Sequence, residues 1–193
     1  MPKRPRHPTP AYRQSVPERR IAYDLGPMPA EARAMLTVDE RVVRAPLGTI
    51  FELARRVDRW PEHLAHYRFV RYRERSPDGG GVVEMSAFRP FGPLGWPTWW
   101  ASEMAVYHGD GRTGERPRIR FRHVGGITTG MDVEWSFDPA ADGVLVRIVH
   151  AWDGPRWPLI GRFAAVRVIG PIFVHGIASR TLAGLAKAAE EGE

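Results

Sequence analysis

The sequence predicts an α+β fold in which about seven antiparallel strands form one curved sheet around a long C-terminal helix, with two short helices after the first strand. Two observations predict it. Short segments of alternating apolar and polar residues, separated by glycine- and proline-rich turns, fill most of residues 37–152. One long segment, residues 159–190, is instead apolar at helical spacing. A sheet of this length must wrap the helix, and the wrap encloses space on its concave face.

The first strand and the two short helices are predicted within residues 37–66. Thr37–Arg44 alternates apolar and polar side chains, as a half-buried strand does. Pro46 then suits the first turn of a helix that extends to about Arg56. That helix carries four apolar side chains at helical spacing, Leu47, Ile50, Phe51 and Ala54. A second short helix is predicted over residues 61–66, which begin with proline.

Six further strands are predicted from period-two patterns and from the turns between them. The strands are Tyr67–Arg75, Val82–Arg89, Trp96–Tyr107, Arg118–Val124, Thr128–Phe137 and Val144–Trp152. The turns between them are Ser76–Gly81, Pro90–Gly95, His108–Pro117, Gly125–Gly130 and Asp138–Gly143. Because consecutive strands joined by short turns pair antiparallel, we expect one antiparallel sheet.

The C-terminal segment predicts two helical pieces. It is apolar almost all round up to Ala178 and amphipathic beyond, so its first part must be buried in protein or lipid. Gly170–Pro171 should break or kink it, which gives helices over about 159–169 and 171–190, the second lying along the sheet. Insertion of residues 159–178 into a membrane surface is an alternative. Two arginines and a histidine in that stretch argue against a spanning helix.

Composition predicts one domain preceded by an arm. Residues 1–36 are proline-rich and carry seven Lys/Arg against three Asp/Glu, which predicts a flexible basic arm able to lie along the domain or a partner. Residues 37–193 are nearly neutral in charge, so we expect no nucleic-acid-binding face. The chain has no cysteine, which excludes disulfides, thiolate zinc sites and cysteine nucleophiles. No signal peptide is recognisable, and the expected location is the cytoplasm.

Aromatic residues gather on the predicted sheet. Period two places Trp96, Trp100 and Met104 on one face, and Trp99 and Tyr107 on the other. Such residues either form the wall of an apolar ligand site or fill a large core. The predicted ligand-binding residues are Trp96, Trp100, Met104, Phe121, Trp135, Trp152, Phe173 and His175.

Two histidines lie within predicted strands among apolar neighbours. His123 and His150 could exchange a proton with a ketone or an enol, and Glu134 or Asp132 could partner one of them. The alternative is that each histidine is a structural residue or faces solvent. The strand that contains His123 also carries Ile119 and Phe121 on the same face, and we expect this face to be the inner one. Arg89, Arg120 and Arg122 could bind a carboxylate or phosphate, but we expect them in solvent.

Other motifs predict no further chemistry. His63 and His66 have the spacing of metal ligands, but no carboxylate or cysteine completes a site, so no metal is expected. Gly125–Gly130 joins two strands and does not open a helix, so it is expected to be a hairpin turn and not a phosphate-binding loop. No Gly-x-Ser-x-Gly nucleophile motif is present.

Several local strings resemble the START-like (SRPBCC) superfamily, which has the helix-grip fold. They are Val57-Asp-Arg-Trp-Pro-Glu62, Trp135-Ser-Phe-Asp-Pro139, Val146-Arg-Ile-Val-His150 and the Gly161–Pro171 segment. The resemblance covers about residues 37–190 and is closest to the polyketide cyclase/dehydrase branch. It implies a hydrophobic tunnel between sheet and C-terminal helix that holds a lipid, isoprenoid or polyketide-like molecule, without a metal or organic cofactor.

These observations leave three functions open. The first is a passive binder of a hydrophobic small molecule. The second is a cofactor-independent enzyme similar to polyketide cyclases and aromatases, with His150 or His123 and Glu134 as catalytic residues. The third is an interaction protein that acts through the basic arm. Fold resemblance alone does not decide among them.

Overall fold

The computed structural model describes residues 16–19, 21–29, 33–89, 96–110, 114–155, 169 and 174–192, with only the backbone of Arg89 and Trp96. The elements follow one another as β1 (Met35–Val43), α1 (Leu47–Arg55), the 3-10 turn η2 (Val57–Arg59), α2 (Trp60–His63), β2 (Tyr67–Arg75), β3 (Gly81–Arg89), β4 (Trp96–Tyr107), β5 (Arg118–Gly126), β6 (Asp132–Ala140), β7 (Gly143–Trp152) and α4 (His175–Glu191).

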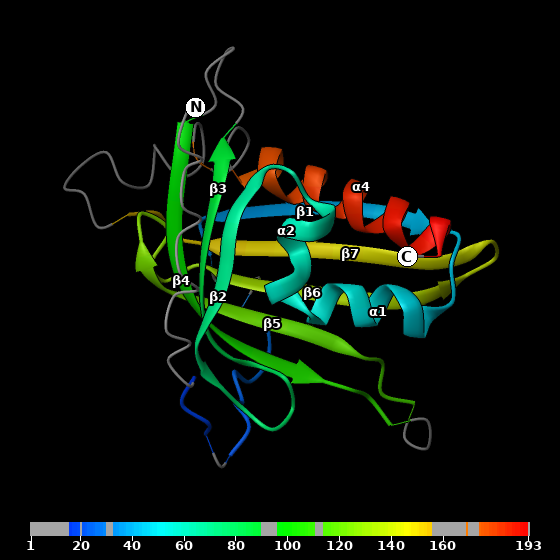
Figure 1. The fold of residues 1–193 in the computed structure, drawn as a ribbon, viewed down its shortest axis with the longest axis horizontal. Coiled ribbons are helices and arrows are strands. Elements are labelled where there is room, and N and C mark those ends of the chain that lie inside the picture. Colours follow the sequence, from blue (N-terminus) through cyan, green and yellow to red (C-terminus); the bar gives the residue numbers. More distant parts are fainter. Residues whose placement is uncertain are drawn as a thin grey trace, which may run out of the picture.

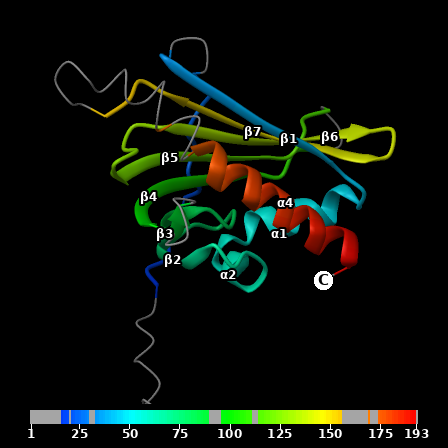
Figure 2. The ribbon, with the colours of Figure 1, turned by 90° about the horizontal axis from the view of Figure 1, so that it is seen from above.

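Seven strands form one antiparallel sheet in the order β1-β7-β6-β5-β4-β3-β2, so the first strand pairs with the last and both edges come from the N-terminal half. The sheet curves strongly, and α4 lies across its concave side with α1 and α2 at the open end (Figures 1 and 2). The predicted α+β architecture, with a curved sheet around a C-terminal helix, is confirmed.

The short helices close the open end of the sheet through specific contacts. Pro61 lies in the first turn of α2, where its missing N–H costs no hydrogen bond. The indole Nε1 of Trp60 donates to the carbonyl of Leu53 over 3.1 Å, which ties α2 to α1. A Cβ on Gly184 of α4 would lie 2.3 Å from Leu64 Cδ2, so glycine permits the close approach of α4 to α2.

Several boundaries differ from the prediction, chiefly those of β6 and α2. Strand β6 begins at Asp132 and not at Thr128, because residues 127–130 form the turn after β5. It also continues to Ala140, which pairs with Gly143, so the predicted turn Asp138–Gly143 is shorter than expected. Helix α2 ends at His63. The predicted helix over 159–169 lies, except for Ile169, outside the described residues.

The described part of the N-terminal stretch lies against the domain. Residues 17–19 pair with Arg75 at the end of β2, and the backbone N–H of Leu25 donates to the Tyr107 hydroxyl over 3.0 Å. The side chain of Leu25 is buried. Residues 17–19 therefore extend the β2 edge of the sheet, and Leu25 and Gly26 lie over its outer face, which is one of the two positions that composition left open for the arm.

The N-terminal residues that lie on the sheet help to bury a cluster of charged side chains. Arg120 was expected in solvent, but its side chain is fully buried and donates to the carbonyl of Gly26. Asp132, also fully buried, lies 3.5 Å from Arg120, 3.0 Å from Arg122 and 3.1 Å from Arg33. The cluster joins Gly26 and Arg33 to strands β5 and β6 on the face opposite the helix.

No helix in the described part of the chain is long and apolar enough to cross a membrane. Most of the stretch considered for insertion into a membrane surface, residues 159–178, lies outside the described residues.

Candidate ligand-binding cavity

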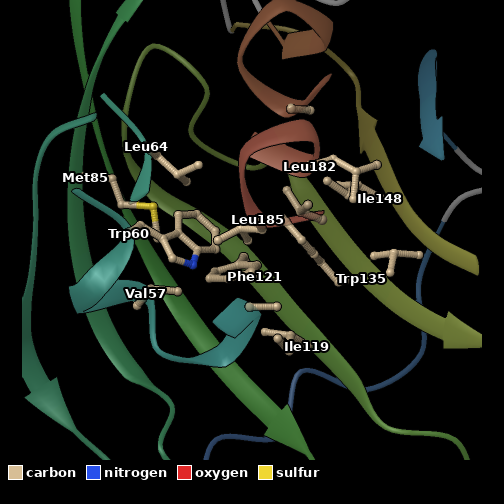
Figure 3. Packing of buried hydrophobic residues seen from close by; sticks show 14 of the residues in the cluster. Val57, Trp60, Leu64, Met85, Ile119, Phe121, Trp135, Ile148, Leu182 and Leu185 are labelled. Atoms are coloured by element: carbon tan, nitrogen blue, oxygen red, sulfur yellow. The ribbon is translucent and has the colours of Figure 1, made fainter. Parts of the chain in front are cut away.

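A cavity of about 100 Å³ lies between the concave face of the sheet and helix α4. Its apolar wall is formed by Trp60, Met85, Trp100, Phe121, Ile127, Met131, Val133, Trp135, Ile148, Ile169, Val174, Ile177 and Ala178. Trp60, Met85, Phe121, Trp135 and Ile148 reach toward the centre of the fold in Figure 3, where Leu182 and Leu185 of α4 meet them. Ile127 lines the cavity and is 36% exposed, so the cavity reaches the surface beside the β5–β6 turn.

Strand alternation and register build this wall. Phe121 pairs with Val133, and Val133 with His150, so the three side chains form a row across β5, β6 and β7 on the inner face. Thr37 of β1 extends the same row, because it pairs with His150. Residues one position away point to the other face of the sheet.

Three indoles give the cavity its aromatic character. The rings of Trp60 and Trp135 lie 5.6 Å apart between centroids, and Trp60 meets Tyr67 edge-on at 5.3 Å. The Trp100 ring stacks on His123 with centroids 6.1 Å apart and an interplanar angle of 20°. Aromatic faces of this kind suit a flat apolar ligand.

The two inner histidines form one polar region of the wall. Nδ1 of His123 lies 2.7 Å from the Thr128 hydroxyl, and Nδ1 of His150 lies 3.4 Å from the Thr37 hydroxyl. Burial lowers the pKa of His123 to about 3. Burial, and then the charge of the nearby His123, lowers the pKa of His150 to about 3. Both imidazoles are therefore neutral near pH 7 and act as hydrogen-bonding groups.

A second polar region lies where β2 meets α4. The Thr181 hydroxyl is 3.3 Å from the Tyr67 hydroxyl and 3.1 Å from Nε2 of His66. Tyr67 and Thr181 line the cavity, whereas His66 stands behind them. Burial raises the pKa of Tyr67, so its phenol stays protonated, and lowers the pKa of His66 to about 4. No Lys, Arg, Asp or Glu lies among the described residues that line the cavity.

The sequence itself identifies the family to which this fold and cavity belong. The family described as polyketide cyclase / dehydrase and lipid transport matches residues 43–168, about two thirds of the chain. The chain belongs to this family. The START-like assignment made from the sequence is confirmed. Among curated proteins, none matches the sequence.

Solved structures share the fold of this polyketide cyclase/dehydrase family member. TTHA0849 from Thermus thermophilus has 17% identity and a TM-score of 0.64, over 82% of this chain and 99% of its own. The Zhui aromatase/cyclase from Streptomyces sp. R1128 has 15% identity and a TM-score of 0.62, over 82% and 96%. The di-domain ARO/CYC StfQ of the steffimycin pathway has 20% identity and a TM-score of 0.61, over 84% and 53%. This chain thus spans about half of StfQ, and at these identities the likeness concerns the fold.

Among the predicted site residues, five line the cavity of this family member. Three are predicted ligand-binding residues and two are the histidines considered for catalysis; the five are Trp100, Phe121, Trp135, His123 and His150. Their shared position follows from strand alternation, which the sequence pattern already carries.

Four predicted site residues lie elsewhere. Met104 is buried under the Tyr72 hydroxyl, 3.9 Å from its sulfur. Trp152 donates its indole N–H to the Thr129 carbonyl over 3.0 Å, which holds it at the β5–β6 turn. Nδ1 of His175 lies 2.5 Å from Oδ1 of the buried Asp39 of β1, and the His175 side chain is more than half exposed. Glu134 points to the outer face, 3.7 Å from Arg120, because its neighbour Val133 points inward.

Two more predicted residues, the side chain of Trp96 and all of Phe173, lie outside the described residues. The structure adds residues that the sequence did not single out for the site, of which Tyr67, Thr98, Thr128 and Thr181 are polar. Tyr67 and Thr181 are 114 positions apart, and no local pattern pairs them. Among the described residues no group of histidines and carboxylates could hold a metal ion.

The buried histidines predict a pH-dependent stability. Unfolded histidines take up a proton near pH 6.5, whereas His123 and His150 in the folded protein do so only near pH 3. Between these values the unfolded state binds more protons, so the free energy of unfolding should fall as the pH drops from 6.5 toward 3. The expected slope is about 1 kcal/mol per pH unit for each histidine.

Urea unfolding between pH 4 and pH 8 measures the free energy of unfolding, and NMR of the imidazole nitrogens over the same range measures the pKa of each histidine. Neutral rings down to about pH 4 would agree with this burial. A ring that titrates near its ordinary pKa would contradict it.

Proposed function

We propose that this protein binds a hydrophobic small molecule, a lipid, isoprenoid or polyketide-like compound, in the cavity between the sheet and α4. One observation carries the proposal: an apolar cavity between the sheet and α4, open beside Ile127, with three indoles on its wall and only neutral polar groups among its described lining residues. A filled core would leave no such space, because protein interiors are packed to the density of organic crystals. Membership of a family described by both cyclisation and lipid transport supports the same interpretation.

An enzymatic role, similar to that of the aromatase/cyclases, is the second candidate. It is favoured by the position of two histidines, His123 and His150, on one cavity wall. The pKa of about 3 of both histidines argues against an enzymatic role, because a general base works best with a pKa near the working pH. Glu134, the proposed acid partner, lies on the opposite face of the sheet. The geometry therefore supports binding better than proton transfer.

The variant His150→Phe separates these two roles. If the protein is a binder, the variant should retain an apolar ligand with an affinity within about tenfold of the unchanged protein, because the wall stays apolar. If it is a cyclase that uses His150, product formation from a polyketide substrate should be lost. Turnover by the unchanged protein that persists in His150→Phe would remove this histidine from the catalytic residues.

Native mass spectrometry of freshly purified protein, followed by organic extraction, tests the binding function. A single retained small molecule is the expected result. A second measurement tests binding even if the ligand is lost during purification. It is a fluorescence titration with the uncharged probe N-phenyl-1-naphthylamine, whose emission rises in an apolar site. An apo mass together with no saturable probe binding would contradict the proposal.

A further inference from the structure

The cavity has two separate polar regions, and each has a hydrogen-bonding group left for a ligand. At the first, the Thr128 hydroxyl lies 2.7 Å from Nδ1 of His123. When this hydroxyl donates to Nδ1, the neutral ring carries its proton on Nε2, on the other side of the imidazole. Nε2–H is then a donor for an oxygen of the ligand.

The second region offers an acceptor. The single proton of the Thr181 hydroxyl is used at the shortest of its contacts, 2.8 Å from the carbonyl oxygen of Ile177. Its oxygen then accepts from Nε2–H of His66 at 3.1 Å and from the Tyr67 hydroxyl at 3.3 Å. The phenolic oxygen of Tyr67, on the cavity wall, keeps its lone pairs for a hydroxyl of the ligand.

The space between the two regions sets the size of the ligand. The rings of Tyr67 and His123 each lie 6.1 Å from the Trp100 ring, so they are separated by at most twice that distance. A cavity of about 100 Å³ is of the order that holds a single aromatic ring, since an engineered cavity of about 150 Å³ takes up benzene, and the opening beside Ile127 lets a second ring extend toward the surface. A compact flat molecule fits this space, and its long axis can run along the Trp100 face.

The wall also selects against charge. A carboxylate or phosphate placed among the described lining residues would meet no cation, and it would lose its hydration without an opposite charge to offset that loss. A fatty acid or a phospholipid head group is thus a poor occupant, whereas an uncharged molecule finds a partner at both ends if it offers a hydroxyl to the Tyr67 oxygen and a second oxygen to His123.

We propose that the ligand is an uncharged aromatic compound of one or two rings with an oxygen at each end, one held by His123 and the other by the Tyr67 hydroxyl. The inference rests on the proposed function and makes Tyr67, supported by Thr181 and His66, the residue that selects a hydroxylated ligand. A ligand hydroxyl bound to a phenolic oxygen also explains why a buried tyrosine lines a largely apolar cavity.

Isothermal titration calorimetry with three probes of one skeleton tests the proposal: 2,6-dihydroxynaphthalene, naphthalene and naphthalene-2-carboxylate. The dihydroxy compound should bind about tenfold or more tighter than naphthalene, and the carboxylate should bind weaker than both. Tyr67→Phe should remove about tenfold of the dihydroxy affinity and leave the naphthalene affinity unchanged. The matched control is Tyr72→Phe, which removes a buried hydroxyl bonded to the Gly79 carbonyl, outside the cavity wall.

The outcomes test the role of Tyr67, the selection against charge and the binding function separately. Equal affinity for the dihydroxy compound and naphthalene, or no effect of Tyr67→Phe, would overturn the role of Tyr67. Tighter binding of the carboxylate would overturn the selection against charge. If N-phenyl-1-naphthylamine binds and none of the three probes does, the inference fails while the binding function stands. If no compound binds, both fail.

Discussion

Replacing Ala178 with phenylalanine is expected to abolish ligand binding and to leave the fold intact. Ala178 is a buried residue of α4 whose side chain lines the cavity. A phenyl ring in its place would occupy much of a space of about 100 Å³, so a ligand and the new side chain would compete for it. We expect the affinity for N-phenyl-1-naphthylamine to fall about 100-fold or more. The free energy of unfolding should change by less than about 3 kcal/mol.

The matched control places the same side chain elsewhere on the same helix. Lys187 is 73% exposed at its side chain, and Lys187→Phe should leave the probe affinity unchanged. A circular-dichroism spectrum equal to that of the unchanged protein confirms that Ala178→Phe folds. Full affinity in a folded Ala178→Phe variant would show that the ligand binds somewhere other than this cavity.

Replacing Asp132 with asparagine is expected to destabilise the protein by about 3 kcal/mol. The fully buried carboxylate contacts Arg33, Arg120 and Arg122, and Arg120 is itself fully buried. Asparagine keeps the shape and removes the charge, so Arg120 would keep only Glu134 at 3.7 Å as a carboxylate partner. A buried charge that is left incompletely paired lowers the free energy of unfolding far more than the loss of an ion pair at the surface. Urea unfolding at pH 7 measures the difference through the midpoint.

Glu40→Gln is the matched control for charge removal. Glu40 pairs with Arg147 at 3.1 Å, and both side chains are exposed by more than a third. Its loss should cost less than about 1 kcal/mol, because water screens such a pair. Equal destabilisation by the two substitutions would show that burial of the Asp132 cluster does not matter to stability.

The fold was predictable because its evidence is local. Tyr67–Arg75 and Trp96–Tyr107 have the predicted bounds, since alternation and flanking turns define a strand within its own segment. The β5–β6 turn was placed less well: the strand was predicted to begin at Thr128, but residues 127–130 form the turn after Gly126. Composition also left open whether the N-terminal stretch lies along the domain, because the contacts of Leu25 with Tyr107 and of Gly26 with Arg120 join residues far apart in the chain.

The site was predictable only in part. His123, Phe121 and His150 follow from alternation once the inner face is known, and sequence analysis placed them in the site. Glu134 did not meet a histidine, because register sets which face of a neighbouring strand a residue joins. The contact of Tyr67 with Thr181 joins β2 to α4, and no pattern in either segment predicts it.

By itself, then, the sequence determined the order of strands and helices, the inner face of the strand that carries His123 and the family, because periodicity, turn chemistry and short motifs act within a few residues. Only the tertiary structure decided which inner residues surround empty space and which are packed, and where the polar groups of that space meet. Those properties depend on register, on sheet curvature and on the path of α4, which bring together residues far apart in the chain.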